Sequence, residues 1–210
     1  MFSDVSLSFR EFVMHEPLPV ARIQDAIFEF LRGRDDAVMF GAQAVNAYVP
    51  EARTTKDVDI MSTRAPELAE EIRKFLSEKF HIAMRVRNVR NGLGYRIYQL
   101  QKPENRHLVD VRPVKQFPPA HRLEGVLVPT LEEVIANKVC AYHERKRKTK
   151  GISDLLDLAR LFEAHPEMKS ESGPVAERLR ANGADENVIA EWRDLVAREI
   201  EPENEEDEFL

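Results

Sequence analysis

Two aspartates, Asp57 and Asp59, are the residues whose type and spacing most directly suggest chemistry. Acids alternate with apolar residues in the run Asp57-Val58-Asp59-Ile60-Met61, which predicts a strand with both carboxylates on one face. At ~4 Å and an effective dielectric of ~20, two carboxylates repel by about 4 kcal/mol unless a proton or cation lies between them. Hard cations such as Mg²⁺ bind carboxylates and substrate phosphates together, so the pair predicts a metal-dependent phosphate site. An exposed edge strand with solvated aspartates is the alternative.

A glycine turn precedes this pair by sixteen residues. Residues 36–40 are short and apolar enough for a buried strand, and residues 42–48 have the composition of a short helix. Gly41 between them permits a tight turn and leaves the first N–H groups of the helix unobstructed. Such N–H groups commonly bind phosphate, so the sequence predicts an anion site beside the acidic strand.

Positive charges extend an apolar stripe of the helix expected at 131–146, for which Thr130 and Glu133 predict a capping box. Lys138 lies seven residues after Leu131 on this stripe, and Arg145 lies seven residues further. A lysine facing a core is costly unless it is paired, so the stripe predicts an anionic partner; snorkelling to the surface is the alternative.

A further helix is expected to begin with Ser153 as its N-cap. Asp154 and Asp157 are i,i+3 neighbours on it, and because like charges so placed repel, each is expected to need a cationic partner. Lys138 and Arg145 are the candidates.

Together these segments resemble nucleotidyltransferases of the DNA polymerase β superfamily. The run Arg53-x-Thr55-x-Asp57-x-Asp59 looks most like the AbiEii type, the toxins of type IV toxin–antitoxin systems. The resemblance covers roughly residues 36–165, and the glycine turn, the Asp-x-Asp and the Lys, Arg and Asp-x-x-Asp positions occur in the expected order. Ala42 stands where the family has Gly or Ser, so a hydroxyl contact to phosphate is absent while the backbone contacts remain.

The resemblance implies a reaction and assigns roles to residues. A nucleoside monophosphate would move from an NTP to an acceptor, and pyrophosphate would leave. Asp57 and Asp59 would bind one or two Mg²⁺ ions together with Asp110, the acid between apolar residues in the strand expected at 108–114. The alternative for Asp110 is an ion pair with Arg96 or Arg112. Catalytic roles fall on Asp57, Asp59, Asp110, Lys138 and Asp154, and nucleotide binding on Gly41, Ala42, Arg53, Thr55, Lys138, Arg145 and Asp157.

The expected fold is α/β (α+β): a small mixed sheet flanked by helices, followed by a helical C-terminal portion. Residues 81–115 alternate with period two around an Asn91-Gly92 turn, which predicts strands at 82–87, 95–102 and 108–114. Pro118 and Pro119 mark a hinge. We therefore expect a nucleotidyltransferase core with an N-terminal helical arm at 1–118, a helical portion at 119–200 and an acidic, disordered tail at 201–210.

Charge patterning points to a phosphate-bearing partner. Seven acids and no basic residue lie between Glu199 and Leu210, and without them the formal net charge of −6 becomes about +1. One basic cluster lies at 145–150, and the other contains nine Lys/Arg: Arg85, Arg87, Arg90, Arg96, Lys102, Arg106, Arg112, Lys115 and Arg122. A solvated charged surface is the alternative.

The expected acceptor is an RNA or tRNA end or a protein hydroxyl, and an antitoxin protein is a possible partner. The lone Cys140, the lack of a secretory signal and the lack of a long apolar run predict a cytoplasmic protein that no membrane anchors. Three alternatives remain open. One is a small-molecule, antibiotic-type nucleotidyltransferase, and another is a non-catalytic nucleotide-binding relative, which Ala42 and Ser153 would favour. The third is a plain two-metal hydrolase, which the lack of a histidine cluster among the metal ligands disfavours.

Overall fold

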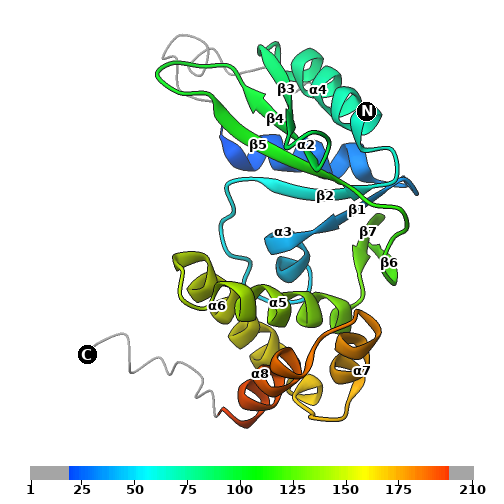
Figure 1. Ribbon diagram of the computed structural model, residues 1–210. Coiled ribbons are helices and arrows are strands. Elements are labelled where there is room, and N and C mark those ends of the chain that lie inside the picture. The colour runs from blue at the N-terminus through cyan, green and yellow to red at the C-terminus, as the bar shows by residue number, and fades with distance from the viewer. Residues whose placement is uncertain (1–18, 199–210) are drawn as a thin grey trace. The chain divides into compact units, whose positions relative to one another are not determined.

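The computed structural model describes residues 19–198, so the N-terminal 18 residues and the predicted acidic tail lie outside it. The chain divides into two compact units (Figure 1). Unit 1 comprises Met1–Phe40 and Thr54–Val128, and unit 2 comprises Gly41–Arg53 and Pro129–Leu210. The chain thus leaves unit 1 at the glycine turn and returns just before the Asp-x-Asp.

A five-stranded mixed sheet forms the centre of unit 1, which confirms the predicted fold class. Its order is β1-β2-β5-β4-β3, with β2 and β5 parallel and the other neighbours antiparallel. The strands are β1 (Ala37–Phe40), β2 (Val58–Ser62), β3 (Met84–Val89), β4 (Gly94–Gln99) and β5 (Arg106–Pro113). A separate two-stranded sheet, β6 (Ala120–Leu123) and β7 (Val126–Pro129), follows and was not predicted.

One face of the five-stranded sheet is buried. Val58, Ile60, Ile97, Val109 and Val111 are at most 1% exposed, and helix α4 (Ala65–Phe80) packs against β2, β3, β4 and β5. Helix α2 (Val20–Leu31) packs against α4 (Figure 1). Because side chains alternate along a strand, the residues between these apolar ones are on the opposite face of the sheet.

A β-bulge interrupts this alternation on β5. Ile97 pairs with Val109, but the next residue of β4, Tyr98, pairs with His107, so Leu108 has no partner in the ladder. Leu108 and Val109 are consecutive and both are buried. The extra residue therefore places His107 and Asp110, three positions apart, on the same face of the sheet.

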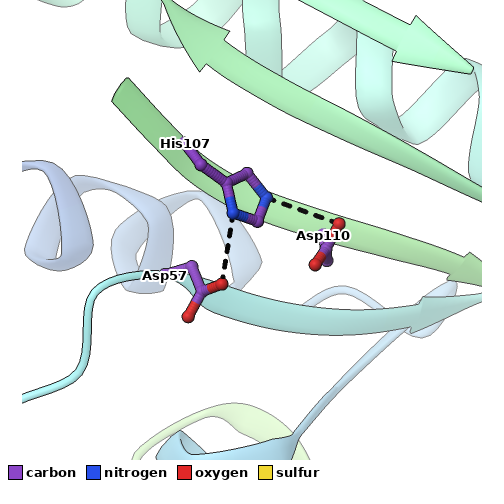
Figure 2. Close-up of side chains that lie close together, drawn as sticks. All are labelled: Asp57, His107 and Asp110. Carbon is purple, nitrogen blue, oxygen red and sulfur yellow. Dashed lines mark ion pairs between the residues drawn. The ribbon is translucent and has the colours of Figure 1, made fainter. Parts of the chain in front are cut away.

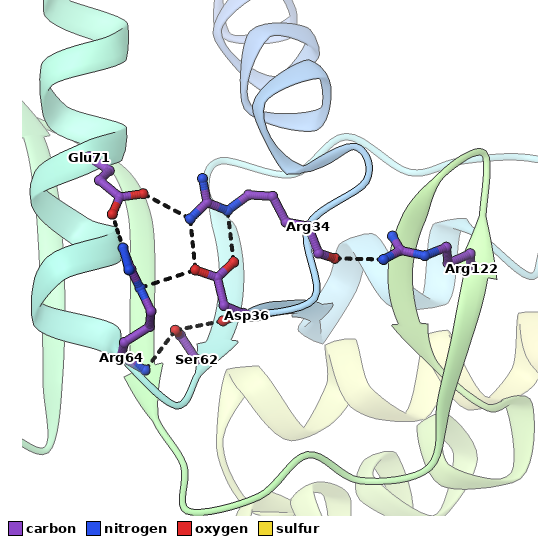
Figure 3. A network of polar contacts seen from close by, with 6 residues as sticks. All are labelled: Arg34, Asp36, Ser62, Arg64, Glu71 and Arg122. Carbon is purple, nitrogen blue, oxygen red and sulfur yellow. Dashed lines mark hydrogen bonds and ion pairs between the residues drawn. The ribbon is translucent and has the colours of Figure 1, made fainter.

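A polar network fastens the beginning of β1 to the end of β2 (Figure 3). Arg34 donates two hydrogen bonds to the Asp36 carboxylate, at 2.8 and 2.7 Å, and one to Glu71 of α4. Arg64 also binds both acids. Ser62 Oγ, which is buried, donates to the Asp36 carbonyl at 2.7 Å and accepts from the Arg64 N–H at 3.1 Å. These contacts hold β1 against β2, the strand that contains Asp59.

Unit 2 is helical. Short helix α3 (Gly41–Asn46) packs against α5 (Leu131–Arg145) and α6 (Thr149–Ala164), and Trp192 of α8 is fully buried against Phe162 of α6. Its other elements are the 3₁₀ turn η1 (Pro166–Met168), α7 (Pro174–Ala181) and α8 (Glu186–Ala197). No helix among residues 19–198 is long and apolar enough to cross a membrane.

One predicted helix start and one predicted capping box were wrong. Helix α6 begins at Thr149, not at Ser153, because Gly151 lets the chain turn tightly: a Cβ there would lie 2.2 Å from the Arg145 carbonyl oxygen. Thr130 does precede α5, but its side chain makes no capping bond. Glu133 instead accepts hydrogen bonds from Asn137, Arg178 and Asn182, so the capping box does not form.

We predict that Ser62→Ala lowers the free energy of unfolding by about 1–3 kcal/mol, because the Asp36 carbonyl and the Arg64 N–H each lose their hydrogen bond to the buried hydroxyl. Urea denaturation measures this loss. Ser153→Ala, at an exposed position of α6, is the matched control and should stay within about 0.5 kcal/mol of wild type. Equal stabilities for the two variants would contradict the importance of the Ser62 hydroxyl.

Candidate active site

Asp57, His107 and Asp110 form a compact cluster on the face of the sheet opposite α4 (Figure 2). His107 lies between the two acids: its Nδ1 is 3.3 Å from Asp57 Oδ2 and its Nε2 is 3.4 Å from Asp110 Oδ1. Asp57 immediately precedes β2, and the other two residues belong to β5, the parallel neighbour of β2. Pairing of these two strands therefore brings the acids together.

Asp59 is on the same face by strand alternation and lies directly opposite Asp110 in the register of β2 and β5. It is half-buried, as Asp57 and Asp110 are. Its carboxylate does not belong to the group of ligand atoms within 4.8 Å of one another, which among the described residues comes from Asp57, His107 and Asp110. The three predicted metal-binding acids (Asp57, Asp59 and Asp110, hereafter the acid cluster) thus share a face of two paired strands.

The charges of Asp57, His107 and Asp110 stabilise one another. Burial disfavours a charged His107, but hydrogen bonds and charges from Asp110 and Asp57 outweigh it and raise the pKa of the imidazole to about 10. Burial also opposes ionisation of Asp110, yet His107 and Arg96 lower the pKa of its carboxyl below the ordinary value. The Arg96 Nε lies 2.9 Å from Asp110 Oδ1, so the ion pair expected under the alternative interpretation is also present.

The donor set fits a hard divalent cation. Carboxylate oxygens are the ligands that Mg²⁺ prefers, and it is usually held by one or two of them together with substrate phosphates. The imidazolium of His107 occupies the position between two carboxylates where a cation would be attracted. The cluster therefore has the charge and the oxygen ligands that the predicted metal requires.

His107 was missed by the sequence reasoning. In a regular strand it would share the face of Val109 and point toward the core, away from Asp110. The bulge at Leu108 reverses that orientation, and nothing in the alternating pattern of 106–113 indicates the extra residue. Two consecutive apolar residues before Asp110 are the only sequence signal, and they also fit a strand buried on both faces.

In unit 2, buried ion pairs join the other predicted site residues. Lys138 Nζ lies 2.6 Å from Asp157 Oδ2 and 3.2 Å from Asp154 Oδ1. Arg145 pairs with Asp154 at 2.8 Å, and Arg53 binds both oxygens of Asp157 at 2.6 and 3.0 Å. The expected pairing of Lys138 and Arg145 with the two aspartates is confirmed. We call these five residues the unit 2 charge network.

The unit 2 charge network is largely shielded from solvent. The Asp157 side chain is 0% exposed and that of Lys138 is 12% exposed, so this lysine does not snorkel to the surface. Burial raises the cost of an ionised Asp157, but Arg53 and Lys138 outweigh it and lower the pKa of the carboxyl. The network contains three cations and two carboxylates, which leaves one positive charge in excess.

The glycine turn and the residues before the Asp-x-Asp have defined places. Gly41 has φ +69°, a left-handed conformation that favours glycine, and it begins α3 with Ala42 second. Arg53 belongs to unit 2, where Asn46 also binds its backbone N–H and carbonyl at 3.1 and 2.9 Å. Thr55 belongs to unit 1 and is buried, and its Oγ1 and carbonyl both accept from Gln24 at 2.9 and 3.0 Å.

Comparisons with known proteins identify the family and the fold. The family model described as the nucleotidyl transferase AbiEii toxin of type IV TA systems matches residues 25–209. No curated protein sequence matches the chain significantly. The Megavirus polyadenylate synthase has a similar fold, with a TM-score of 0.57 and 11% identity over 79% of this chain and 39% of that chain. This chain therefore spans about two-fifths of the viral protein.

Two further solved structures are less similar. JHP933 from Helicobacter pylori has a TM-score of 0.49 and 14% identity, over 91% of this chain and 92% of that chain. An antigenic nucleotidyltransferase-like protein from Paracoccidioides brasiliensis has a TM-score of 0.46 and 14% identity, over 83% of this chain and 89% of that chain.

The raised pKa of His107 predicts how the stability of the metal-free protein depends on pH. Because the folded pKa of about 10 exceeds the unfolded value of ~6.5, the charged imidazole stabilises the fold fully below ~6.5, and this contribution is lost as pH rises toward 10. Urea unfolding in EDTA should therefore show the advantage of wild type over His107→Gln shrinking across this range. A constant difference would contradict the ion pairs.

The unit 2 charge network predicts a large cost for Asp157→Asn. Removing this carboxylate leaves Lys138 and Arg53 without their shared partner, and breaking a buried pair costs about 3–5 kcal/mol. Denaturant unfolding at neutral pH measures the loss, and Asp194→Asn at an exposed position of α8 is the control. Because the folded pKa of Asp157 is lowered, its contribution should vanish as pH falls through that pKa. A neutral effect at pH 7 would mean that the pairs are unimportant.

Proposed function

This chain belongs to the AbiEii family of nucleotidyl transferase toxins, and on that premise we propose that it transfers a nucleoside monophosphate from an NTP to RNA. The observation that carries the proposal is the acid cluster, three aspartates at two paired strands, on the face of the unit 1 sheet opposite α4. We propose an RNA or tRNA end as the acceptor and an antitoxin protein as the partner that restrains the activity.

The proposed reaction is a displacement at the α-phosphorus of the NTP. An acceptor oxygen forms a bond to the α-phosphorus of the NTP, and the bond from that phosphorus to the bridging oxygen breaks. Pyrophosphate leaves, and the hydroxyl proton passes to a carboxylate of the acid cluster. Mg²⁺ held by the acid cluster would supply charge stabilisation at the reacting phosphate. Phosphoryl transfer asks the protein mainly for position and charge.

The residues of unit 1 have different roles in this reaction. Asp57, Asp59 and Asp110 would hold one or two Mg²⁺ ions through their oxygens. Arg96, 2.9 Å from Asp110, orients that carboxylate and favours its ionised state. In the metal-free protein His107 supplies the positive charge that the acids need.

For unit 2 we propose that Lys138 and Arg145 contact the anionic substrate, with Gly41 and Ala42 offering backbone N–H groups. The cations of the unit 2 charge network support this, because positively charged side chains attract an anionic substrate. Asp154 and Asp157 would act as positioning residues that hold the cations. Arg53 binds Asp157 on the other side and, with Thr55, would fix the segment that leads to the Asp-x-Asp.

We predict that Asp57→Asn and Asp59→Asn each lower NTP incorporation at least about a hundredfold, because a preorganised charge at the reacting phosphate is lost. The measurement is transfer of label from each α-³²P-labelled NTP to total RNA with Mg²⁺, at matched protein concentration. The control Asp25→Asn, at an exposed position of α2, should retain wild-type incorporation. Full activity of either acid-cluster variant, with an unchanged melting temperature, would refute the metal assignment.

A further inference from the structure

The face of the unit 1 sheet that carries the acid cluster extends beyond these acids onto β4 and β3. Paired residues on neighbouring strands share a face, and the register continues outward from Asp110 to Arg96 on β4 and then to Arg87 on the edge strand β3. A second row runs from His107 to Tyr98 and Arg85. The acids therefore lie at one end of a continuous strip whose other end is basic and aromatic.

The outer cations of this strip have no acidic partner among the residues that the structure describes. Arg85 and Arg87 are exposed, and neither makes an ion pair within residues 19–198. Arg96, one strand closer to the acids, is paired with Asp110. In contrast to Arg34 and Arg64, which bind carboxylates, Arg85 and Arg87 keep their full charge for an external anion.

These arginines line a hollow. Arg85, Arg87, Tyr98 and Asn105 surround it, and we call these four residues the arginine face. The Tyr98 ring is half-buried and lies 5.2 Å, centroid to centroid, from the ring of His107. An aromatic surface therefore stands between the arginines and the acid cluster, at the point where a strand approaching the acids would pass.

The chemistry of the arginine face selects its occupant. Unpaired arginines in a hollow favour phosphate oxygens, which they bind through several N–H donors at once. A half-buried tyrosine offers a stacking surface for an unpaired base, and this combination of basic groove and aromatic platform is how single strands are bound without sequence preference. A cationic small molecule would be repelled by both arginines on this approach.

We propose that the arginine face binds the acceptor as a single-stranded stretch of RNA, with Arg85 and Arg87 on its phosphates and Tyr98 against a base. The strand end then points along the strip toward the acid cluster. This inference rests on the proposed nucleotidyl transfer and deepens it, because it assigns acceptor recognition to unit 1 residues that are not part of the metal site.

The test is binding of a fluorescein-labelled single-stranded RNA of about twelve nucleotides, within the usual site sizes, to the full-length protein by anisotropy at several salt concentrations. Arg85→Gln/Arg87→Gln should lower the affinity about tenfold at ~0.1 M salt and flatten the plot of log affinity against log salt by about 1.4, which is ~0.7 per phosphate contact. Tyr98→Ala should also weaken binding, whereas Tyr98→Phe should retain it.

The matched control is Arg73→Gln/Lys74→Gln on α4, the helix that packs on the opposite side of the sheet. It removes the same charge and should leave both the affinity and the salt slope unchanged. If the two double variants behave alike, the arginine face is a solvated surface and the inference is wrong. Equal competition by duplex RNA, or binding of polyglutamate in place of RNA, would also overturn it.

A kinetic arm separates this inference from the proposed function. With wild type active, Arg85→Gln/Arg87→Gln should raise KM for the RNA acceptor and leave KM for the NTP within about twofold. An unchanged acceptor KM would reject the arginine face while nucleotidyl transfer stands. If wild type transfers no nucleotide but binds RNA in a manner that depends on Arg85 and Arg87, transfer is rejected and the binding surface stands.

Discussion

Repulsion between neighbouring carboxylates is the constraint on which the rest of this structure depends. Parallel pairing of β2 and β5 sets Asp59 opposite Asp110 and brings Asp57 near the same site. At ~4 Å and an effective dielectric of ~20, a close pair such as Asp57 and Asp110, which have carboxylate oxygens within 4.8 Å of each other, costs about 4 kcal/mol without a counter-charge. His107 and Arg96 provide that charge in the protein itself, and a divalent cation would provide it in the active enzyme. In unit 2, the repulsion between Asp154 and Asp157 is likewise offset by nearby cations, which are Lys138, Arg145 and Arg53.

Much of the acid cluster could be predicted because strand alternation is a local rule. Asp57 and Asp59, two residues apart, had to share a face, and Asp110 between two buried valines had to point away from the core. The pairing of Lys138 with the aspartates followed from helical periodicity and from the cost of a buried, unpaired lysine. In each case the physics acts over a few residues and so is visible in the sequence.

The features that could not be predicted depend on strand pairing and on contacts between residues far apart in the sequence. The bulge at Leu108 reverses the side on which His107 lies, and a single inserted residue leaves no clear trace in the hydrophobic pattern. Arg53 and Asp157 are 104 residues apart, so no periodicity connects them. The capping box failed for a similar reason: Glu133 is taken by Arg178 and Asn182 of the α7 segment, and tertiary contacts override the local motif.

The run Arg53-x-Thr55-x-Asp57-x-Asp59 acquires a physical meaning from these contacts. Arg53 is bound in unit 2 by Asp157 and Asn46, whereas Thr55, two residues later, is bound in unit 1 by Gln24. The chain thus passes from unit 2 to unit 1 between Arg53 and Thr55, and a single residue separates Thr55 from Asp57. An extended segment so short has little freedom, because each ordered backbone residue removes about 1–2 kcal/mol of conformational entropy. The alternate positions of the motif therefore carry two anchors and then the two acids proposed to bind metal, and the anchors fix where the acids begin.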